Sequence, residues 1–334
     1  MKRYEINTWG ELYKNPNNAA FKAPNDVDQI YIRNGFKVFR LPSATFLYKL
    51  RLGMVYRIIY ALFILFRLNK KCEVHIQVTG SRITRYLIPF VRFRAKKIVL
   101  LIHDVIFLRN PNTNEAREEI TLYNSVDEII VHTPAMATIL KQQGVYVPMK
   151  TLMLFDYLTH TNKEMYAESD IHSIVFAGNL QKSSFIKLLI TASKEWNLPI
   201  YCYGAGKLPK MEEHTHIHYE GTFSPDNISS IKGAWGLVWD GNDLLTCDSY
   251  LTYNAPHKVS LYLAAEKPVI IWRQSALYDF VNDYKLGLTI DSLHDIPDKL
   301  FQITEEQYRE YVENVRIVSE KLKTGYFLSA HLSS

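Results

Sequence analysis

The stretch 253–272, YNAPHKVSLYLAAEKPVIIW, constrains the fold most, because it joins a helix suited to an anion to a buried strand. Pro256 favours the opening of the helix, and a Lys-Pro pair stops it. The apolar run 269–272 is typical of a strand buried on both faces of a parallel sheet. The first turn of the helix offers hydrogen-bond donors from His257, Lys258 and Ser260. The stretch therefore predicts half of a nucleotide site, with a phosphate at the helix N-terminus.

A shorter segment upstream, residues 173–180, predicts the other half of that site. It has the pattern of an apolar strand that ends in Gly178 and Asn179, and Lys182 follows just before a helical pattern. Small residues at the carboxyl end of a parallel strand let a ligand approach the backbone, and the next helix terminus favours a phosphate. Two such turns in one domain predict a diphosphate.

Two more segments supply candidates for the wall of the nucleotide site. Tyr203 ends the apolar run 200–203, and Gly204 follows it directly. We expect these two residues to line the site, because they too follow a strand. Phe223 could offer its ring to the base of a nucleotide, although a place in the hydrophobic core is the alternative.

Apolar runs and amphipathic stretches alternate along the chain, which is typical of an α/β protein with parallel sheets. The length of 334 residues is long for one core and comfortable for two. A polar linker around 155–170 separates the two halves. The expected strands lie at 37–40, 74–78, 98–102, 128–131, 174–176, 200–203, 217–220, 236–239, 269–272 and 287–290, and the clearest helices at 117–124, 134–142 and 305–323.

Composition predicts a globular protein, since 47% of the residues are hydrophobic and 22% are charged. Three widely spaced cysteines form neither a disulfide framework nor a zinc motif, which favours a reducing compartment. The first residues, MKRYEIN, have no apolar core and no cleavage site of a signal peptide. We therefore expect a cytoplasmic location.

The N-terminal half is strongly cationic. Between residues 31 and 100 there are fifteen Lys and Arg residues, and Glu73 is the only acid. Residues 48–66 predict a helix whose uncharged run, 58–66, is shorter than the roughly twenty residues that span a bilayer. The helix could lie on an anionic membrane surface, or it could be a core helix with solvated basic flanks. Nucleic acid is not expected as a partner, because no recognition module appears.

Six motifs occur in order along the chain: LIHD at 101–104, LFDYL at 154–158, FAGNL at 176–180, WGLVWDG at 235–241, the helix 254–263 and KTGYF at 323–327. Together they resemble the motifs of the bacterial O-antigen β-1,6-galactofuranosyltransferases and, more distantly, those of glucosyltransferases that extend sugars on serine-rich adhesins. The resemblance implies the GT-B architecture, with a cleft between two Rossmann-like domains. It implies an acceptor domain at 1–158, a nucleotide-sugar domain at 170–310 and a C-terminal helix, 311–334, that crosses back to the first domain.

Catalytic candidates follow from strand ends in the first half of the chain. His103 and Asp104 directly follow the strand 98–102, so they emerge at the carboxyl edge of that sheet. We expect Asp104 to be the general base that deprotonates the acceptor hydroxyl, with His103 as the rival. The alternative is that Asp104 caps the next helix. Asp156, at the hinge, could face the same cleft or be merely solvated.

On the donor side, we expect Lys258 and His257 to oppose the negative charge that develops on the departing nucleoside diphosphate. Asp240 is expected near a sugar hydroxyl. Asp240 and Asp243 could instead form a metal-binding carboxylate pair, but the strand before them favours a turn. We therefore predict no metal site and no cofactor beyond the UDP-sugar donor substrate.

These expectations predict an inverting transferase that moves galactofuranose from UDP-galactofuranose to a glycan carried on a polyprenyl diphosphate. It would act in surface polysaccharide synthesis, peripherally bound to the cytoplasmic face of the membrane. One alternative is a UDP-glucose-dependent glucosyltransferase that acts on a glycoprotein. The other is a non-catalytic glycan-binding partner. Assembly into a homo-oligomer is left open by the sequence.

Overall fold

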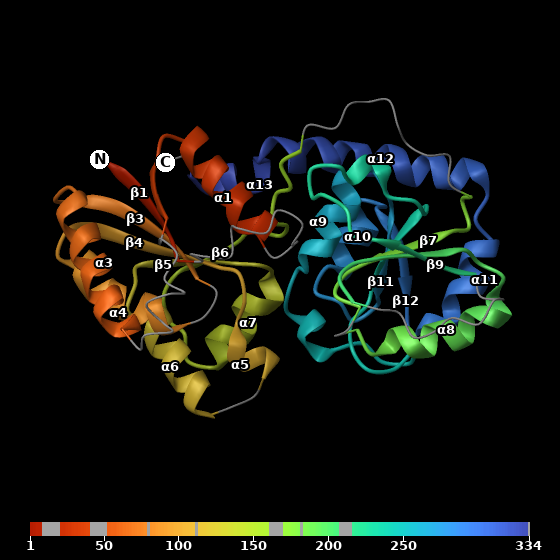
Figure 1. The fold of residues 1–334 in the computed structure, drawn as a ribbon, viewed down its shortest axis with the longest axis horizontal. Helices are drawn as coiled ribbons and strands as arrows, with labels where there is room; N and C mark the ends of the chain where they lie inside the picture. Colours follow the sequence, from red (N-terminus) through yellow and green to blue (C-terminus); the bar gives the residue numbers. More distant parts are fainter. Residues whose placement is uncertain are drawn as a thin grey trace. The chain divides into compact units, whose positions relative to one another are not determined.

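A computed structural model describes residues 1–8, 21–40, 52–78, 81–110, 113–159, 170–180, 183–206 and 216–332. The chain divides into two compact units. Unit 1 comprises Met1–Met153 together with Phe327–Ser334, and unit 2 comprises Leu154–Tyr326. Each unit holds one six-stranded sheet, and the strands described in both sheets pair in parallel (Figure 1). The predicted α/β class with two sheets is confirmed.

Unit 1 has the strand order β2-β1-β3-β4-β5-β6. Its strands are β1 Arg3–Asn7, β2 Lys37–Arg40, β3 Cys72–Val78, β4 Ala95–Ile102, β5 Glu128–Val131 and β6 Met149–Thr151. Its helices are α1 Lys22–Arg33, α3 Gly53–Arg67, α4 Ser81–Arg92, α5 Ile106–Arg109, α6 Thr113–Tyr123, α7 Pro134–Gln142 and, from Phe327 onward, α13 Tyr326–Leu332. The four predicted strands of this half are confirmed, whereas β1 and the short edge strand β6 were not predicted.

The two faces of the unit 1 sheet differ in chemistry, which explains why β1 escaped prediction. Side chains alternate along a strand, so Glu5 and Asn7 share a face with their neighbours His75 and Gln77 in the register of β1 with β3. These four polar residues are buried. The strand RYEIN therefore buries polar side chains on one face and lacks the continuous apolar run by which buried parallel strands are recognised.

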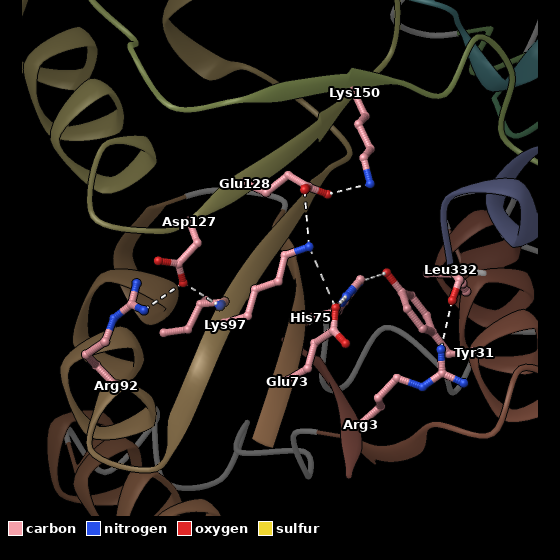
Figure 2. Close-up of polar contacts among 11 residues, drawn as sticks. Arg3, Tyr31, Glu73, His75, Arg92, Lys97, Asp127, Glu128, Lys150 and Leu332 are labelled. Atoms are coloured by element: carbon pink, nitrogen blue, oxygen red, sulfur yellow. Dashed lines mark hydrogen bonds and ion pairs between the residues drawn. The ribbon is translucent and has the colours of Figure 1, made fainter. Parts of the chain in front are cut away.

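A chain of charged contacts crosses the polar face of the unit 1 sheet (Figure 2). Glu128 on β5 accepts from Lys150 on β6 at 3.1 Å and from Lys97 on β4 at 3.2 Å. Lys97 also lies 3.9 Å from Glu73 on β3. Burial works against the charge of Glu128, but its two lysine partners hold the pKa of this carboxyl below its usual value. Four neighbouring strands are thus linked by ion pairs as well as by backbone hydrogen bonds.

His75 ends this chain and connects it to α1. Its Nε2 lies 3.1 Å from Glu73 Oε1 and its Nδ1 lies 2.9 Å from the Tyr31 hydroxyl (Figure 2). A carboxylate only accepts, so Nε2 carries the hydrogen and Nδ1 accepts from Tyr31. Burial lowers the pKa of His75 and raises that of Tyr31, which keeps both groups neutral at pH 7.

The last residues of the chain are tied to unit 1 by its first strand. The guanidinium of Arg3 donates to the carbonyl of Leu332 at 2.8 Å and to the carbonyl of Asn34 at 2.6 Å. Asn34 in turn donates to the hydroxyl of Ser329 at 3.0 Å. The C-terminal helix therefore completes the layer that α1 begins on the polar face.

Unit 2 has the strand order β12-β11-β10-β7-β8-β9. Its strands are β7 Ile174–Ala177, β8 Ile200–Tyr203, β9 Ile217–Gly221, β10 Trp235–Val238, β11 Val269–Trp272 and β12 Gly287–Ile290. Its helices are α8 Phe185–Trp196, α9 His257–Ala264, α10 Tyr278–Asp283, α11 Ile296–Phe301 and α12 Glu305–Thr324. All six strands predicted in this half are confirmed, and α12 agrees with the predicted final helix.

Helix α12 has both of its ends defined by sequence. Thr304 and Gln307 form a capping box at its start, and Gly325, with φ of 83°, follows its end in the left-handed conformation. The helix packs on α9, where Ser319 donates to the carbonyl of Ala264 at 3.1 Å. Glu266, directly after α9, accepts from Lys323 at 3.0 Å. Helix α9 is thereby held by α12 as well as by the sheet.

The turns that follow β7, β8 and β9 approach one another through backbone alone. Gly178 donates its amide to the carbonyl of Tyr203 at 3.0 Å, and Gly204 donates to the carbonyl of Gly221 at 2.8 Å. A Cβ atom on Gly204 would lie 1.7 Å from the carbonyl oxygen of Gly178. Gly204 also has φ of +143°, which L-residues rarely adopt. The carboxyl edge of this sheet can close only with glycine at this position.

We predict that Gly204→Ala lowers the free energy of unfolding by about 3 kcal/mol, because a backbone clash adds to an unfavourable φ. Gly221→Ala is the matched control, because Gly221 also has positive φ, at +77°, but a Cβ there would meet nothing within 4 Å. It should cost only about 1 kcal/mol. Denaturant unfolding of both variants measures the difference, and equal losses would contradict the close approach.

Candidate functional site

The strand order of unit 2 reverses between β7 and β10. Strands β7, β8 and β9 lie on one side of that point, and β10, β11 and β12 lie on the other. In open parallel sheets a ligand binds outside the carboxyl ends of the strands where the order reverses. The register of β7 with β10 covers only Ile174 with Trp235 and Val175 with Gly236. Beyond those pairs the two strands no longer bond to each other.

The hydroxyl of Tyr262, on α9, occupies the opening between these strands. It accepts from the amide of Ala177 on β7 at 2.7 Å and lies 3.3 Å from the carbonyl of Leu237 on β10, to which it donates. Burial raises the pKa of Tyr262, so the hydroxyl keeps its proton. A Cβ on Gly236 would lie 2.2 Å from the Tyr262 ring. Gly236 thus makes room for the side chain that joins the two halves of the sheet.

Lys258, predicted as a donor-binding residue, lies at the same reversal point. Its Nζ donates to the carbonyl of Trp239, at the end of β10, at 3.1 Å. The ammonium group also lies 4.8 Å from the centroid of the Phe176 ring on β7. The part-buried side chain therefore runs inward over the strand ends. Burial lowers the pKa of Lys258, while the Asp240 carboxylate opposes that shift.

Residues 240–246 form the turn that the sequence favoured over a metal site. The Asp243 carboxylate accepts from the amides of Leu245 and Thr246 at 2.8 and 2.6 Å, and these bonds lower its pKa. Asp240 accepts from the amide of Gly241 at 3.0 Å. In the ranges that the structure describes, no three His, Cys, Asp or Glu side chains gather as a metal-binding group.

The wall of the site contains two aromatic residues in contact. The rings of Tyr203 and Phe223 lie 5.5 Å apart, edge to face at 88°. The hydroxyl of Tyr203 accepts a hydrogen bond from the amide of Lys232 at 2.9 Å, which holds the ring in place. Asn179 accepts at its backbone carbonyl from Ser183 at 3.1 Å. Lys182, the remaining predicted residue of this wall, lies outside the described residues.

Helix α9 begins at His257, after Pro256 as its N-cap. The His257 ring stacks on that of Tyr157 at 5.2 Å and 23°. Ser260 is 1% exposed, so its hydroxyl lies inside the helix packing rather than at the helix entrance. Among the described donor-site residues, the backbone of the first turn of α9, His257 and Lys258 are therefore the groups that can meet an anion.

Asn254 is a polar residue at this helix entrance that the predicted site omitted. It is 5% exposed, and its side-chain oxygen accepts no hydrogen bond from the described part of the protein. A buried acceptor normally has a donor, and a ligand hydroxyl or amide would supply one. Asn254 stands two positions before Pro256 in the stretch 253–272. A polar residue just ahead of a phosphate-type helix is the signal that could have identified it.

The sequence left open whether Asp156 faces the cleft or is merely solvated, and the structure shows that it is buried. It is 3% exposed, and its neighbours Phe155 and Tyr157 are buried as well. The Tyr157 amide donates to the carbonyl of Leu322 on α12 at 3.1 Å, and its hydroxyl donates to the carbonyl of Pro225 at 3.0 Å. The segment is therefore an integral part of unit 2, and the solvated alternative is wrong.

In unit 1, His103 and Asp104 follow β4 at the carboxyl edge of the sheet, as predicted. Asp104 forms an ion pair with Arg109 at 3.0 Å and is partly exposed. His132, at the end of the neighbouring strand β5, lies 3.1 Å from the carbonyl of Ile102. Burial lowers the pKa of His132 to about 4, although the nearby Asp104 opposes the shift. His132 is thus neutral at pH 7, and Arg109 is the cation that balances Asp104.

Gln77, at the carboxyl end of β3, determines how His103 is oriented. Its side-chain nitrogen donates to Asp28 at 2.7 Å and to Glu5 at 3.0 Å. Its side-chain oxygen must therefore accept, and His103 Nε2 lies 2.8 Å from it. In neutral His103 the hydrogen is then on Nε2, and Nδ1 carries the lone pair. This pairing could not be predicted from the sequence, because Gln77 lies on β3 whereas His103 follows β4.

Glu5 and Asp28 form a buried carboxyl pair behind Gln77. Burial raises the pKa of Glu5 well above its usual value, and the neighbouring Asp28 raises it further. The Asp28 carboxylate accepts hydrogen bonds from the side chains of Asn7, at 2.8 Å, and Arg40, at 2.6 Å. Burial nevertheless raises the pKa of Asp28. Burial thus raises the pKa of both carboxyl groups, and the Arg40 guanidinium pairs with Asp28.

Comparison with known proteins agrees with this arrangement. The model of the glucosyltransferase 3-like N-terminal domain matches residues 7–154, and that of the glucosyltransferase 3-like C-terminal domain matches residues 174–334. The β-1,6-galactofuranosyltransferase WbbI of Escherichia coli K12 is 33% identical over 248 residues, which are 71% of each chain. The chain belongs to the glucosyltransferase 3-like family.

Two further similarities bear on activity and fold. Glucosyltransferase 3 of Streptococcus parasanguinis is 28% identical over 240 residues, 69% of this chain and 67% of that protein. The crystal structure of Anabaena HepE in complex with UDP and glucose superposes with a TM-score of 0.65 over 99% of both chains, at 9% identity. The chain is a glycosyltransferase of GT-B architecture, as the sequence motifs predicted.

We predict that Lys258→Met reduces turnover by about 30-fold to 1000-fold, which corresponds to about 2–4 kcal/mol of transition-state stabilisation. Methionine keeps the contact with Phe176 but cannot oppose negative charge. Lys267→Met is the matched control, because Lys267 is also buried and donates to a backbone carbonyl, that of Gly233, at 2.6 Å. It lies before β11, away from the carboxyl edge, so it should lower stability while turnover persists. Normal turnover of Lys258→Met would remove Lys258 from the site.

Proposed function

We propose that this glycosyltransferase transfers galactofuranose from UDP-galactofuranose to a glycan acceptor carried on a polyprenyl diphosphate, in surface polysaccharide synthesis. The observation that carries the donor assignment is Lys258, whose part-buried side chain places its ammonium group over the reversal point of the unit 2 sheet beside the first turn of α9. The sugar assignment is supported by the name of the relative at 33% identity, a galactofuranosyltransferase. The uridine assignment is supported by the UDP bound in the structural neighbour.

The donor half of the mechanism is electrostatic. As the bond from the anomeric carbon to the diphosphate oxygen breaks, negative charge grows on the diphosphate. Lys258, His257 and the amides at the start of α9 stabilise that charge, which is the role a metal ion has in other transferases. The reaction therefore needs no metal and no further cofactor. The side-chain oxygen of Asn254 and the carboxylate of Asp240 accept hydrogen bonds from the sugar or the nucleoside.

The acceptor half belongs to unit 1. The acceptor oxygen attacks the anomeric carbon opposite the leaving diphosphate, so the configuration inverts, and one base takes the hydroxyl proton. Asp104 is the base in this proposal and His103 is its rival. The Asp104 carboxylate also pairs with Arg109, whose guanidinium lies 3.0 Å away. Nδ1 of His103 is the alternative proton acceptor, because Gln77 takes the hydrogen bond of Nε2.

The second candidate function is glucose transfer from UDP-glucose to a sugar on a glycoprotein. Both family models are named for glucosyltransferase 3, and so is the relative at 28% identity. The third candidate, a non-catalytic glycan-binding partner, differs from both in that it predicts no donor hydrolysis.

The donor assignment predicts that the purified protein hydrolyses UDP-galactofuranose slowly without acceptor, faster than UDP-glucose, UDP-galactopyranose or GDP-mannose. Release of UDP measures this, and the rate should persist in excess EDTA, because Lys258 and His257 supply the charge that a metal would. A preference for UDP-glucose would favour the second candidate. Loss of activity in EDTA that magnesium or manganese restores would overturn the metal-free mechanism.

The base assignment predicts that Asp104→Asn lowers transfer to a glycan acceptor by about 10²- to 10⁴-fold. His103→Gln should lower it less, because that variant leaves the Asp104 carboxylate in place. Thermal shift with UDP should be unchanged in both variants, since donor binding belongs to unit 2. If His103→Gln has the larger effect, His103 is the base and Asp104 is a positioning residue.

A further inference from the structure

The exposed side of α3 is an apolar stripe. Side chains of this helix that are 40–77% exposed recur at spacings of three and four residues, which places them along one face. They are Val55, Ile58, Ile59, Leu62, Phe63 and Phe66. The opposite face is held by Tyr60, Ala61 and Ile64, which are at most 6% exposed. A contiguous exposed stripe of this kind marks a surface that meets an apolar partner.

Helix α4 packs beside α3 and extends the stripe (Figure 1). Tyr86 on α4 is 47% exposed, and Phe93, the residue directly after the end of α4, is 81% exposed. Phe66 and Phe93, the two most exposed of these aromatic residues, stand at the C-terminal ends of the two helices. The apolar surface therefore becomes aromatic toward one end of the helix pair.

Basic side chains cluster at that same end. Lys70 and Lys71 directly precede β3, and Arg94 directly precedes β4. Because Cys72 pairs with Ala95 in the register of these parallel strands, the basic residues before them are neighbours. Lys70, Lys71 and Arg94 form no ion pair within the ranges that the structure describes. Phe66 and Phe93 therefore border uncompensated positive charge.

We propose that the α3–α4 surface, defined by the apolar stripe of α3, the exposed aromatic residues of α4 and the adjoining cations Lys70, Lys71 and Arg94, docks on an anionic lipid surface. Aromatic and aliphatic side chains insert at the boundary of headgroups and acyl chains, while Lys and Arg meet the headgroup charge. In the described chain, no helix combines the length and hydrophobicity that a bilayer span requires. The contact is therefore peripheral, and it goes beyond the proposed function because no substrate is involved in it.

Charge is the reason to prefer an anionic membrane to a second copy of this chain. Two arginines of α4 already have partners, since Arg85 pairs with Glu118 at 3.1 Å and Arg92 pairs with Asp127 at 2.6 Å. Among the described residues, Lys70, Lys71 and Arg94 leave positive charge at the aromatic end, so two copies that met there would bring like charges together. An anionic lipid headgroup neutralises them instead.

The test is co-sedimentation with vesicles of phosphatidylglycerol mixed with an equal amount of phosphatidylcholine. The wild-type protein should bind these vesicles in low salt and ignore pure phosphatidylcholine, and binding should weaken as sodium chloride shortens the screening length to about 3 Å near 1 M. Lys70→Gln with Lys71→Gln should weaken partitioning about 30-fold, from roughly 1 kcal/mol per basic residue and tenfold per 1.4 kcal/mol. Adding Phe66→Ser to these two substitutions should weaken vesicle binding further.

Lys187→Gln and Leu188→Ser, on α8 of unit 2, are the matched controls, because both residues are exposed on another helix. They should leave vesicle binding unchanged. Equal binding by the wild type and the Lys70/Lys71 variant would overturn the proposal. A second result would also overturn it: sedimentation equilibrium shows a dimer of the wild type, and Phe66→Ser dissociates this dimer but leaves vesicle binding unchanged. UDP release by every variant should match the wild type, so a wrong donor assignment would leave the vesicle result standing.

Discussion

The hydroxyl of Tyr262 between β7 and β10 is the contact on which the donor half of this enzyme depends. The two strands bond to each other through only two residue pairs and then part, and the Tyr262 hydroxyl takes the amide of one and the carbonyl of the other. The opening exists because the strand order reverses there. Gly236 leaves the space that the ring needs. The same contact fixes α9 over the reversal point, which directs Lys258 at the carboxyl ends of both strands.

Unit 1 differs from unit 2 in that its sheet buries polar and charged side chains, which need hydrogen-bond partners. Ion pairs connect β6 to β3 across one face, and the Glu5–Asp28 carboxyl pair lies toward the carboxyl edge of that face. A buried network of this kind is stable only when each member is satisfied. Gln77 meets part of this demand by donating to both carboxyl groups and accepting from His103, although the second oxygen of Glu5 accepts no hydrogen bond from the described residues. The orientation of a catalytic candidate is thus a by-product of compensating buried charge.

The sequence predicted most strands because buried parallel strands appear as apolar runs, such as 98–102 and 269–272. It missed β1, whose buried residues Glu5 and Asn7 interrupt such a run. It located His103, Asp104 and Lys258 at the strand and helix ends where they lie. It did not show the direction of the Lys258 side chain, because that direction is decided by Phe176 on β7 and by Trp239, which follows β10. Gln77 escaped for the same reason, since its role comes from tertiary neighbours, whereas the position of Asn254 just ahead of the helix that begins at His257 could have identified it.

A crystal structure of the complex with UDP would show whether the diphosphate binds at the reversal point of the unit 2 sheet. We expect a diphosphate oxygen about 3 Å from Lys258 Nζ, with other oxygens facing the first turn of α9. We also expect the Asn254 side-chain oxygen to gain a donor. A diphosphate bound away from α9, with Lys258 still on the carbonyl of Trp239 alone, would show that Lys258 and α9 do not form the donor site.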